Sequence, residues 1–314
     1  MTPSVLDGRE SWTRMVIAIS GSSGLIGSAL VRALGAHGHD VRRIVRGAPS
    51  AATDIAWDVE HGTIDAARLD GVEAVIHLAA ENLAQRWTSA ARRRIRESRV
   101  AGTAALARAL AEMERKPRVL LSASAVGVYG NRGDETLDEQ SATGNDFLAE
   151  VCTAWEAATA PAKDAGIRVA LLRSGLVLSR DGGVLAKMLT PFKLGIGGHL
   201  GSGRQWMSWI SMDDYQRAVN FLLATTAISG PVNVVAPNPV TNAEFTRTLG
   251  RVLSRPSFFP VPKLALNLLL GELAHDTVLA SQRVVPRRLL EAGFDFQHPT
   301  LESALRAALT QSGR

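Results

Sequence analysis

The stretch that decides the fold is MVIAISGSSGLIG, which runs from Met15 to Gly27. It opens with a short apolar run rich in β-branched residues, as expected of a buried strand. Gly21, Gly24 and Gly27 follow at the spacing G-x-x-G-x-x-G, and apolar residues then recur at helical spacing up to Gly35. A strand, a glycine turn and a helix in this order predict a pyrophosphate site, because glycines let the ligand approach the backbone and the first N–H groups of the helix face it. A purely structural turn of small residues is the alternative.

The composition is that of an ordinary globular enzyme. The chain has 314 residues, of which 46% are hydrophobic and 21% charged, with a formal net charge of +5. That charge would suit an acidic or phosphorylated ligand, or a weak affinity for nucleic acid. The one cluster of basic residues, Arg92 to Arg96, lies in a helical pattern and is interpreted as a solvated helix face. Since no nucleic-acid-binding module is recognisable, nucleic acid is not an expected partner.

Compartment and membrane association follow from what the sequence lacks. Cys152 is the one cysteine, so no internal disulfide can form, which suits a reducing cytoplasm. Residues 1–14 are polar and are read as a loose extension without the apolar core of a signal peptide. No apolar run is long enough to span a bilayer, so no membrane partner is expected. No metal site is predicted either.

The second strand carries the prediction of cofactor type. Val41 to Val45 is read as that strand, and Arg46 follows it. An NAD site places an acidic residue near this point to bind the ribose 2′-hydroxyl, and none is present. Arg46, helped by Arg43, therefore predicts a 2′-phosphate and hence NADP; a solvated arginine is the alternative.

The rest of the chain alternates between strand and helix patterns. Strands are expected at 72–78, 119–122 and 168–172, with helices at 88–113 and 147–165 between them. This alternation predicts an α/β fold with a doubly wound parallel sheet. After Arg173 the chain becomes rich in glycine, a helix is expected at 211–225 and a strand at 231–235, and from Asn238 the pattern is mostly helical.

Several segments resemble the extended short-chain dehydrogenase/reductase superfamily, and more narrowly its atypical nucleotide-sugar-epimerase-like branch, sometimes labelled cell-division inhibitor. The matching segments are SGSSGLIG at 20–27, HLAAENLAQRWT at 77–88, SRVAGT at 98–103, SASAVGVYG at 122–130, FLAEVCTAWE at 147–156, LRSGLVLS at 172–179, GIGGHLGSGRQWMSWISMDD at 195–214, NVVAPNPVTNAEF at 233–245, GELAHD at 271–276, SQRVVP at 281–286 and GFDF at 293–296. The resemblance covers nearly the whole chain from Met15.

The resemblance implies a domain division. Residues 1–14 would be the extension and 15–235 a Rossmann domain that binds NADP, with a segment at about 180–210 belonging to the substrate domain. Residues 236–314 would form a smaller, mostly helical C-terminal substrate domain. Superfamily members often dimerise through two long helices, here 88–113 and 147–165, so a homodimer is an open possibility.

The resemblance also implies site residues. The glycine turn would bind the pyrophosphate, residues after the third strand would line the adenosine path, and an acid near the second strand would lie by the adenine. Ser124, or Ser122, would be the hydroxyl that polarises a substrate carbonyl. The cofactor residues implied are Gly21, Ser22, Gly24, Leu25, Ile26, Gly27, Arg46, Asp58, Leu78, Ala79 and Ala80.

The superfamily's Tyr-x-x-x-Lys pair is missing. The tyrosine position falls at Leu148 and the lysine position at Cys152. Leucine has no proton to exchange, and a thiol carries no positive charge. Tyr129 is the candidate replacement, with a tyrosine packed in a loop as the alternative. Cys152 is interpreted as a small buried apolar side chain rather than a nucleophile.

A possible substrate wall lies in the glycine-rich segment and after the third strand. Two tryptophans there would stack on a sugar or base, or would instead fill the seam between domains. Arg86 would face the nicotinamide side, or would pair with Glu81. The candidates are Glu81, Arg86, His199, Gln205, Trp206 and Trp209.

The expected function is that of an NADP-dependent oxidoreductase or epimerase-like enzyme acting on a small molecule, possibly nucleotide-linked. The alternative is a non-catalytic NADP(H)-binding redox sensor or scaffold that kept the cofactor site and lost the acid–base pair. The fold alone does not choose between them, because Rossmann folds host many functions.

Overall fold

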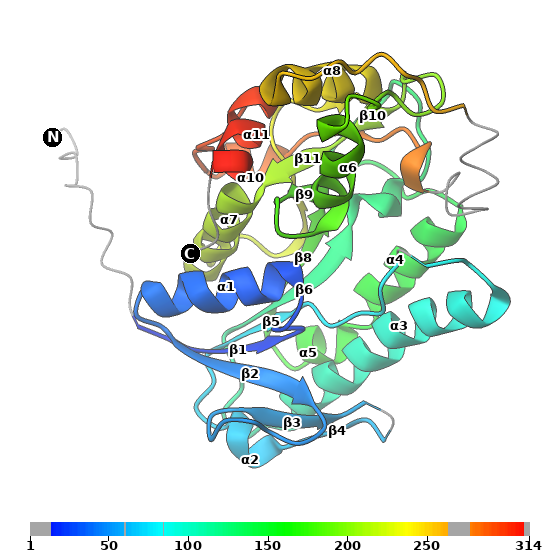
Figure 1. The fold of residues 1–314 in the computed structure, drawn as a ribbon. Helices are drawn as coiled ribbons and strands as arrows, with labels where there is room; N and C mark the ends of the chain where they lie inside the picture. The colour runs from blue at the N-terminus through cyan, green and yellow to red at the C-terminus, as the bar shows by residue number, and fades with distance from the viewer. Residues whose placement is uncertain (1–13, 60, 84, 263–276, 311–314) are drawn as a thin grey trace, which may run out of the picture.

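The computed structural model describes residues 14–59, 61–83, 85–262 and 277–310. Its centre is a sheet in the order β12-β8-β6-β5-β1-β2-β3-β4, in which all neighbours are parallel except β3 and β4 (Figure 1). The strands are β1 (Val16–Ser20), β2 (Asp40–Arg46), β3 (Ile55–Asp58), β4 (Thr63–Ile64), β5 (Ala74–His77), β6 (Val119–Ala125), β8 (Arg168–Ser174) and β12 (Gly230–Val234). The expected doubly wound parallel sheet is confirmed.

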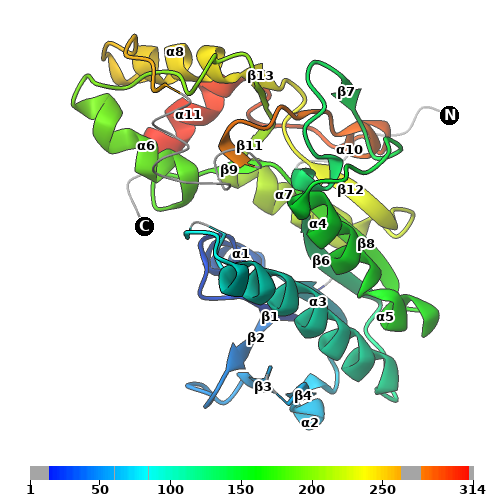
Figure 2. The same cartoon turned by 90° about the vertical axis from the view of Figure 1, so that its right-hand side faces the viewer.

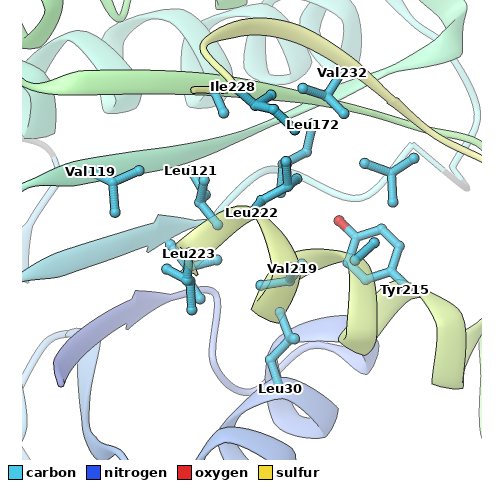
Figure 3. Packing of buried hydrophobic residues seen from close by; sticks show 14 of the residues in the cluster. Leu30, Val119, Leu121, Leu172, Tyr215, Val219, Leu222, Leu223, Ile228 and Val232 are labelled. Carbon is cyan, nitrogen blue, oxygen red and sulfur yellow. The ribbon is translucent and has the colours of Figure 1, made fainter. Parts of the chain in front are cut away.

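Helices cover both faces of this sheet, which is why its central strands are apolar on both sides. On one face α1 (Leu25–Ala36) and α7 (Met212–Ala224) pack on the strands, and Figure 3 shows Leu121 and Leu172 opposite Val219 and Leu222 of α7. On the other face lie α3 (Ser89–Glu112), α4 (Phe147–Ala157) and α5 (Ala160–Asp164), with the short α2 (Ala66–Leu69) at the sheet edge (Figure 2).

A smaller layer lies beyond the carboxyl ends of the central strands (Figures 1 and 2). Its core consists of buried side chains from three helices, α6 (Gly183–Lys193), α8 (Asn242–Leu253) and α11 (Leu301–Thr310), which pack around Trp209 and Phe245. The other elements are η1 (Val126–Tyr129), β7 (Thr136–Leu137), β9 (Leu176–Leu178), β10 (Trp206–Met207), β11 (Trp209–Ser211), β13 (Val240–Thr241) and β14 (Arg283–Val284). The short α10 (Arg287–Glu291) instead packs against β12 at the edge of the central sheet.

Two expectations need correction. The strand expected at 72–78 is the shorter β5. It is the fifth strand of the chain rather than the third, because β3 and β4 precede it. The helix expected at 147–165 is two helices, since α4 ends at Ala157 and α5 restarts with Pro161 in its first turn. Proline suits a first turn and not a helix interior, because it has no N–H to donate.

The expected extension at residues 1–14 and the GELAHD segment lie almost wholly outside the described residues. Within the described part of the chain, no helix is both long and apolar enough to cross a membrane. The same residues contain no group of three or more His, Cys, Asp or Glu side chains that could hold a metal ion.

Candidate cofactor-binding and active site

The glycine turn is built for close contact. Gly21 has a φ of +68°, and a Cβ there would lie 2.8 Å from the carbonyl carbon of Leu78. A Cβ on Gly27 would lie 2.2 Å from the Gly21 oxygen. Glycine is therefore required at both positions. A side chain at Gly21 would collide with the backbone that follows β5, and a side chain at Gly27 would collide with the turn itself. Gly24 caps α1 without a side-chain hydrogen bond, which leaves the first N–H groups of the helix available to a ligand.

A cavity of about 780 Å³ opens beside this turn at the carboxyl ends of β1, β2, β3 and β5. Its wall brings together many of the residues predicted for the cofactor: Gly21, Ser22, Gly24, Arg46, Leu78, Ala79 and Ala80. Leu25 instead lines a second cavity of about 580 Å³ on the far side of the turn, and Ile26 and Gly27 line neither. A groove at the carboxyl ends of parallel strands is where open α/β sheets bind their ligands.

Two arginines at the end of β2 have different environments. Arg43 donates to both carboxylate oxygens of Asp54, at 2.9 and 2.8 Å, and to Ser50. Burial opposes ionisation of Asp54, but the hydrogen bonds from Arg43, Ser50 and Ala51 hold its pKa below the ordinary value. Arg46 is exposed at the cavity, and no described residue pairs with it. Arg46 is therefore the cation available to a ligand phosphate.

Asp58, predicted to lie near the adenine, does not line the cavity, and its role toward the cofactor stays a prediction. It ends β3, is exposed, and forms an ion pair with His61 at 2.7 Å. Its neighbours Trp57 and Val59 line the cavity, and Asp58 is absent from that wall. The side chains of a strand alternate between its faces, so Trp57 and Asp58 point in opposite directions.

Ser124 ends a chain of buried polar groups at the carboxyl end of β6. Its hydroxyl donates to Glu156 Oε1 at 2.6 Å, and Arg173 holds the same carboxylate with two bonds, Nε to Oε1 at 2.8 Å and Nη2 to Oε2 at 2.9 Å. Arg173 Nη1 also donates to the Tyr129 hydroxyl, which donates to Asn233. Such a network fixes the orientation of each member.

Tyr129 is fully buried. Burial raises the pKa of its phenol, and both hydrogen bonds of the hydroxyl go to protein groups. An enclosed hydroxyl cannot reach a substrate without rearrangement, so this placement favours the packed-tyrosine alternative over a proton donor. Ser122, the other serine considered, is also fully buried, and its hydroxyl has no partner among the described residues.

Leu148 and Cys152 lie against η1 on the inner face of α4, and both are buried. Burial raises the pKa of the Cys152 thiol to about 12, with the Glu156 carboxylate adding to the effect. The thiol is therefore neutral at physiological pH, in agreement with its interpretation as a small apolar side chain.

The glycine-rich segment contributes less to a substrate wall than expected. Trp209 is fully buried and donates to the Asn238 carbonyl, while Gln205 is 7% exposed and donates to the carbonyls of Leu200 and Val278. Both serve packing, which was the alternative interpretation for the tryptophan. A composition rich in glycine and aromatics does not say which face a side chain takes, and here β11 directs Trp209 inward.

Trp206 and His199 are half-buried rather than enclosed. The Trp206 indole donates to Asp134 at 2.8 Å, and the Arg283 guanidinium lies 4.3 Å from its ring centroid. His199 Nδ1 lies 3.1 Å from the Gly201 carbonyl. Neither lines the 780 Å³ cavity, so their role toward a substrate stays a prediction.

Glu81 lines the cavity, but its partner is not Arg86. Its Oε1 accepts from Gln85 at 3.2 Å and lies 3.8 Å from Arg94 Nε. Arg86 is exposed and forms no ion pair with the described residues. Sequence reasoning did not identify Glu156 or Arg173 as partners of Ser124. Helical spacing gave a usable signal for Glu156, because it follows Cys152 by one turn on the same helix face.

Comparison with known proteins follows this geometry. Residues 17–235 match the family model "NAD dependent epimerase/dehydratase family", and residues 261–308 match a domain of unknown function, DUF1731. The epimerase family protein Mb2239 of Mycobacterium bovis is 47% identical over 95% of this chain and 99% of its own length. The epimerase family protein YfhF of Bacillus subtilis is 35% identical over 93% of this chain and 97% of its own.

Two solved structures have the same overall fold as this chain. The crystal structure of human epimerase family protein SDR39U1 with NADPH superposes with a TM-score of 0.86 at 33% identity, covering 95% of this chain and 100% of the human one. A UDP-glucose 4-epimerase of Thermotoga maritima with UDP-glucose has a TM-score of 0.73 at 18% identity, over 94% and 97% of the two chains, and shows a shared fold.

Proposed function

Because this chain belongs to the NAD dependent epimerase/dehydratase family, we propose that it binds NADP(H) and acts on a small molecule as an oxidoreductase or an epimerase-like enzyme. The observation that carries the proposal is the cavity between the glycine turn and Arg46, a cation at the end of β2 that has no partner among the described residues. The human relative of known structure was solved with NADPH, which supports the same cofactor here.

The residues around the cavity fit a dinucleotide phosphate. The glycine turn and the start of α1 would bind the pyrophosphate through backbone N–H groups. Arg46 would bind the 2′-phosphate by charge-assisted hydrogen bonds, and the small side chains of Ala79 and Ala80 leave room for the adenosine half. When bound, the nicotinamide supplies a hydride donor or acceptor.

Ser124 is the group that we assign to the substrate oxygen. Its hydroxyl is held by Glu156, which is itself fixed by Arg173, so the serine oxygen keeps one position at the carboxyl end of β6. That hydroxyl has a single proton, which it donates to Glu156 in the free protein. On substrate binding it would turn this proton to the carbonyl oxygen, where it stabilises the negative charge that develops during hydride addition. A nucleotide-linked substrate is part of the proposal, since a neighbour of the same fold was solved with UDP-glucose.

The second candidate function is a non-catalytic NADP(H) sensor or scaffold. It is favoured by Leu148 and the neutral thiol of Cys152 at the positions of the missing pair, and by the enclosure of Tyr129. A protein with this set of residues can bind the cofactor tightly while lacking a group that exchanges protons with a substrate.

One experiment separates the two functions. Wild type and Ser124→Ala are loaded with NADPH, mixed with a panel of carbonyl compounds that includes oxidised nucleotide sugars, and followed for single-turnover loss of NADPH absorbance. The enzyme proposal expects oxidation by wild type and a rate lower by about 10²-fold in Ser124→Ala, as for loss of one oxyanion donor. Tight NADPH binding with no oxidation by any compound would instead support the sensor.

A further inference from the structure

Arg99 differs from the other arginines of α3. Arg93, Arg94 and Arg96 are exposed on the solvent face of the helix, whereas Arg99 is 7% exposed. Burying a guanidinium costs several kcal/mol unless a counter-charge compensates. No carboxylate of the described residues lies within ion-pair distance of Arg99, in contrast to Arg173, which Glu156 holds with two hydrogen bonds. Among the residues that the structure describes, Arg99 is thus a buried cation without a direct ion-pair partner, and the Glu81 carboxylate acts on it only at longer range.

The hydrogen bonds of Arg99 leave one edge of its guanidinium unused. Nη1 donates to the carbonyls of Glu81 and Ile95, each at 3.1 Å. The guanidinium also stacks over Trp155, 5.0 Å from the ring centroid. Nε and Nη2 have no acceptor among the described residues, and neither is a fully enclosed atom. Three of the five N–H donors therefore point to accessible space.

Arg99 lies directly behind one wall of the cleft. Arg99 binds the Glu81 carbonyl, and its neighbour Ser98 accepts from the Glu81 amide at 3.1 Å, so both residues tie α3 to the loop after β5. Glu81 and Ser98 line the 780 Å³ cavity. This loop also carries Ala79 and Ala80, which we assign to the cofactor. Arg99 does not itself line the cavity, but it lies directly behind the Glu81 loop, within reach of a ligand that extends past Glu81.

Arg99 is also on the Ser124 side of that cleft. Its guanidinium stacks over Trp155, which lies on the same buried face of α4 as Cys152, so Arg99 stands against the inner face of that helix. Cys152 itself packs with Ala125 at the end of β6, next to Ser124. Arg46 lies at β2, across β5 and β1 in the sheet order. The two cations thus stand at opposite ends of the cleft.

We propose that Arg99 is a binding residue for the nicotinamide half of the dinucleotide, donating from its Nε–Nη2 edge to the hydroxyl oxygens of the adjoining ribose. The inference rests on the proposed function and deepens it. In this arrangement α3 supplies the cation, because α4 has Leu148 and Cys152 at the positions of the missing tyrosine and lysine. Hydroxyl oxygens are acceptors for a guanidinium edge, and a charged donor makes such bonds stronger than a neutral one does.

The test compares two probes that differ in the nicotinamide half. NADPH carries it and 2′,5′-ADP does not. Both are titrated by calorimetry into wild type, Arg99→Met, Arg99→Lys and the matched control Arg96→Met on the exposed face of α3. Thermal unfolding of each variant verifies that it is folded, and Arg99→Gln, which keeps an N–H donor for the Glu81 and Ile95 carbonyls, replaces Arg99→Met if the latter is unfolded.

We expect Arg99→Met to weaken NADPH about 10-fold to 100-fold while 2′,5′-ADP changes less than about 2-fold. Arg99→Lys should recover part of the loss, and Arg96→Met should match wild type. Unchanged NADPH affinity in Arg99→Met would overturn the inference, and so would an equal loss for both probes, which marks a structural role in holding the Glu81 loop. Failure of wild type to bind either probe would instead defeat the proposed function itself.

Discussion

Ser124 and Glu156 lie 32 residues apart in the chain, and the serine hydroxyl donates to the carboxylate at 2.6 Å. The serine ends β6 and the glutamate lies near the end of α4, so the bond joins the sheet to the helix that covers it. Arg173 of β8 binds the same carboxylate, and the three groups form one buried unit at the carboxyl edge of the sheet. The serine oxygen is thereby held in one position at the carboxyl end of β6.

Removing the charge of Glu156 should destabilise the fold. In Glu156→Gln the guanidinium of Arg173 stays buried without a counter-charge, because the side chains of the pair are only 6% and 11% exposed. We expect the free energy of unfolding to fall by about 3 kcal/mol. Urea denaturation measures it, with the exposed Glu150→Gln of the same helix as the control, expected within about 0.5 kcal/mol of wild type. A Glu156→Gln value equal to that of the control would show that the pair does not stabilise the fold.

His77 should make stability depend on pH. Its ring lies 2.7 Å from the Ser20 hydroxyl and 2.9 Å from that of Thr103, and burial lowers its pKa from 6.5 to about 4. Between these values the unfolded chain binds a proton that the folded chain does not, so stability falls as the pH drops from 6.5 to 4. The loss attributable to His77 is about 3 kcal/mol.

The measurement is urea denaturation across this range for wild type and His77→Gln. The carboxylates and the other histidines affect the stability of both proteins equally, so their contributions cancel in the difference between the two pH profiles. The wild-type profile should be the steeper one below pH 6.5. Parallel profiles would mean that the pKa of His77 is the same in the folded and unfolded protein.

The three glycines of the turn should not respond alike to substitution. A Cβ on Gly24 would lie 3.3 Å from the Gly21 oxygen, a contact that a small shift relieves, whereas a Cβ on Gly27 would lie at 2.2 Å. Gly24→Val should therefore fold and lose NADPH binding, since its side chain would occupy the space of the pyrophosphate. Gly27→Val should lose stability as well. Circular dichroism and calorimetry on the two variants check this, and near-normal NADPH affinity in Gly24→Val would make the turn a structural one.

What the sequence predicted was local. The strand, turn and helix from Met15 to Gly35 could be recognised because apolar period and glycine spacing act over adjacent residues. β3 escaped because it is short and ends in Trp57 and Asp58, without the long apolar run that marked the other strands. Pro161 marks the split between α4 and α5, because proline suits the first turn of a helix and disfavours its interior.

The candidate site was predicted in part. The cavity assembles Gly21, Arg46 and Ala79 from separate strands because parallel strands end at one edge. The partnership of Ser124, Glu156 and Arg173 depends on packing between segments far apart in sequence, and no local pattern contains it. The inward turn of Trp209 has the same origin, since the cores of β11 and α8 decide it.

The measurement that tests the central claim most directly is a fluorescence titration of NADPH and NADH into wild type, Arg46→Ala and the control Arg42→Ala. Arg42 lies on the same strand but donates to the carbonyls of Arg68 and Asp70, away from the ligand. We predict that wild type and Arg42→Ala prefer NADPH, and that Arg46→Ala loses about 1.5–3 kcal/mol of NADPH binding while its NADH binding is unchanged. Equal affinity of wild type for the two cofactors would contradict the account.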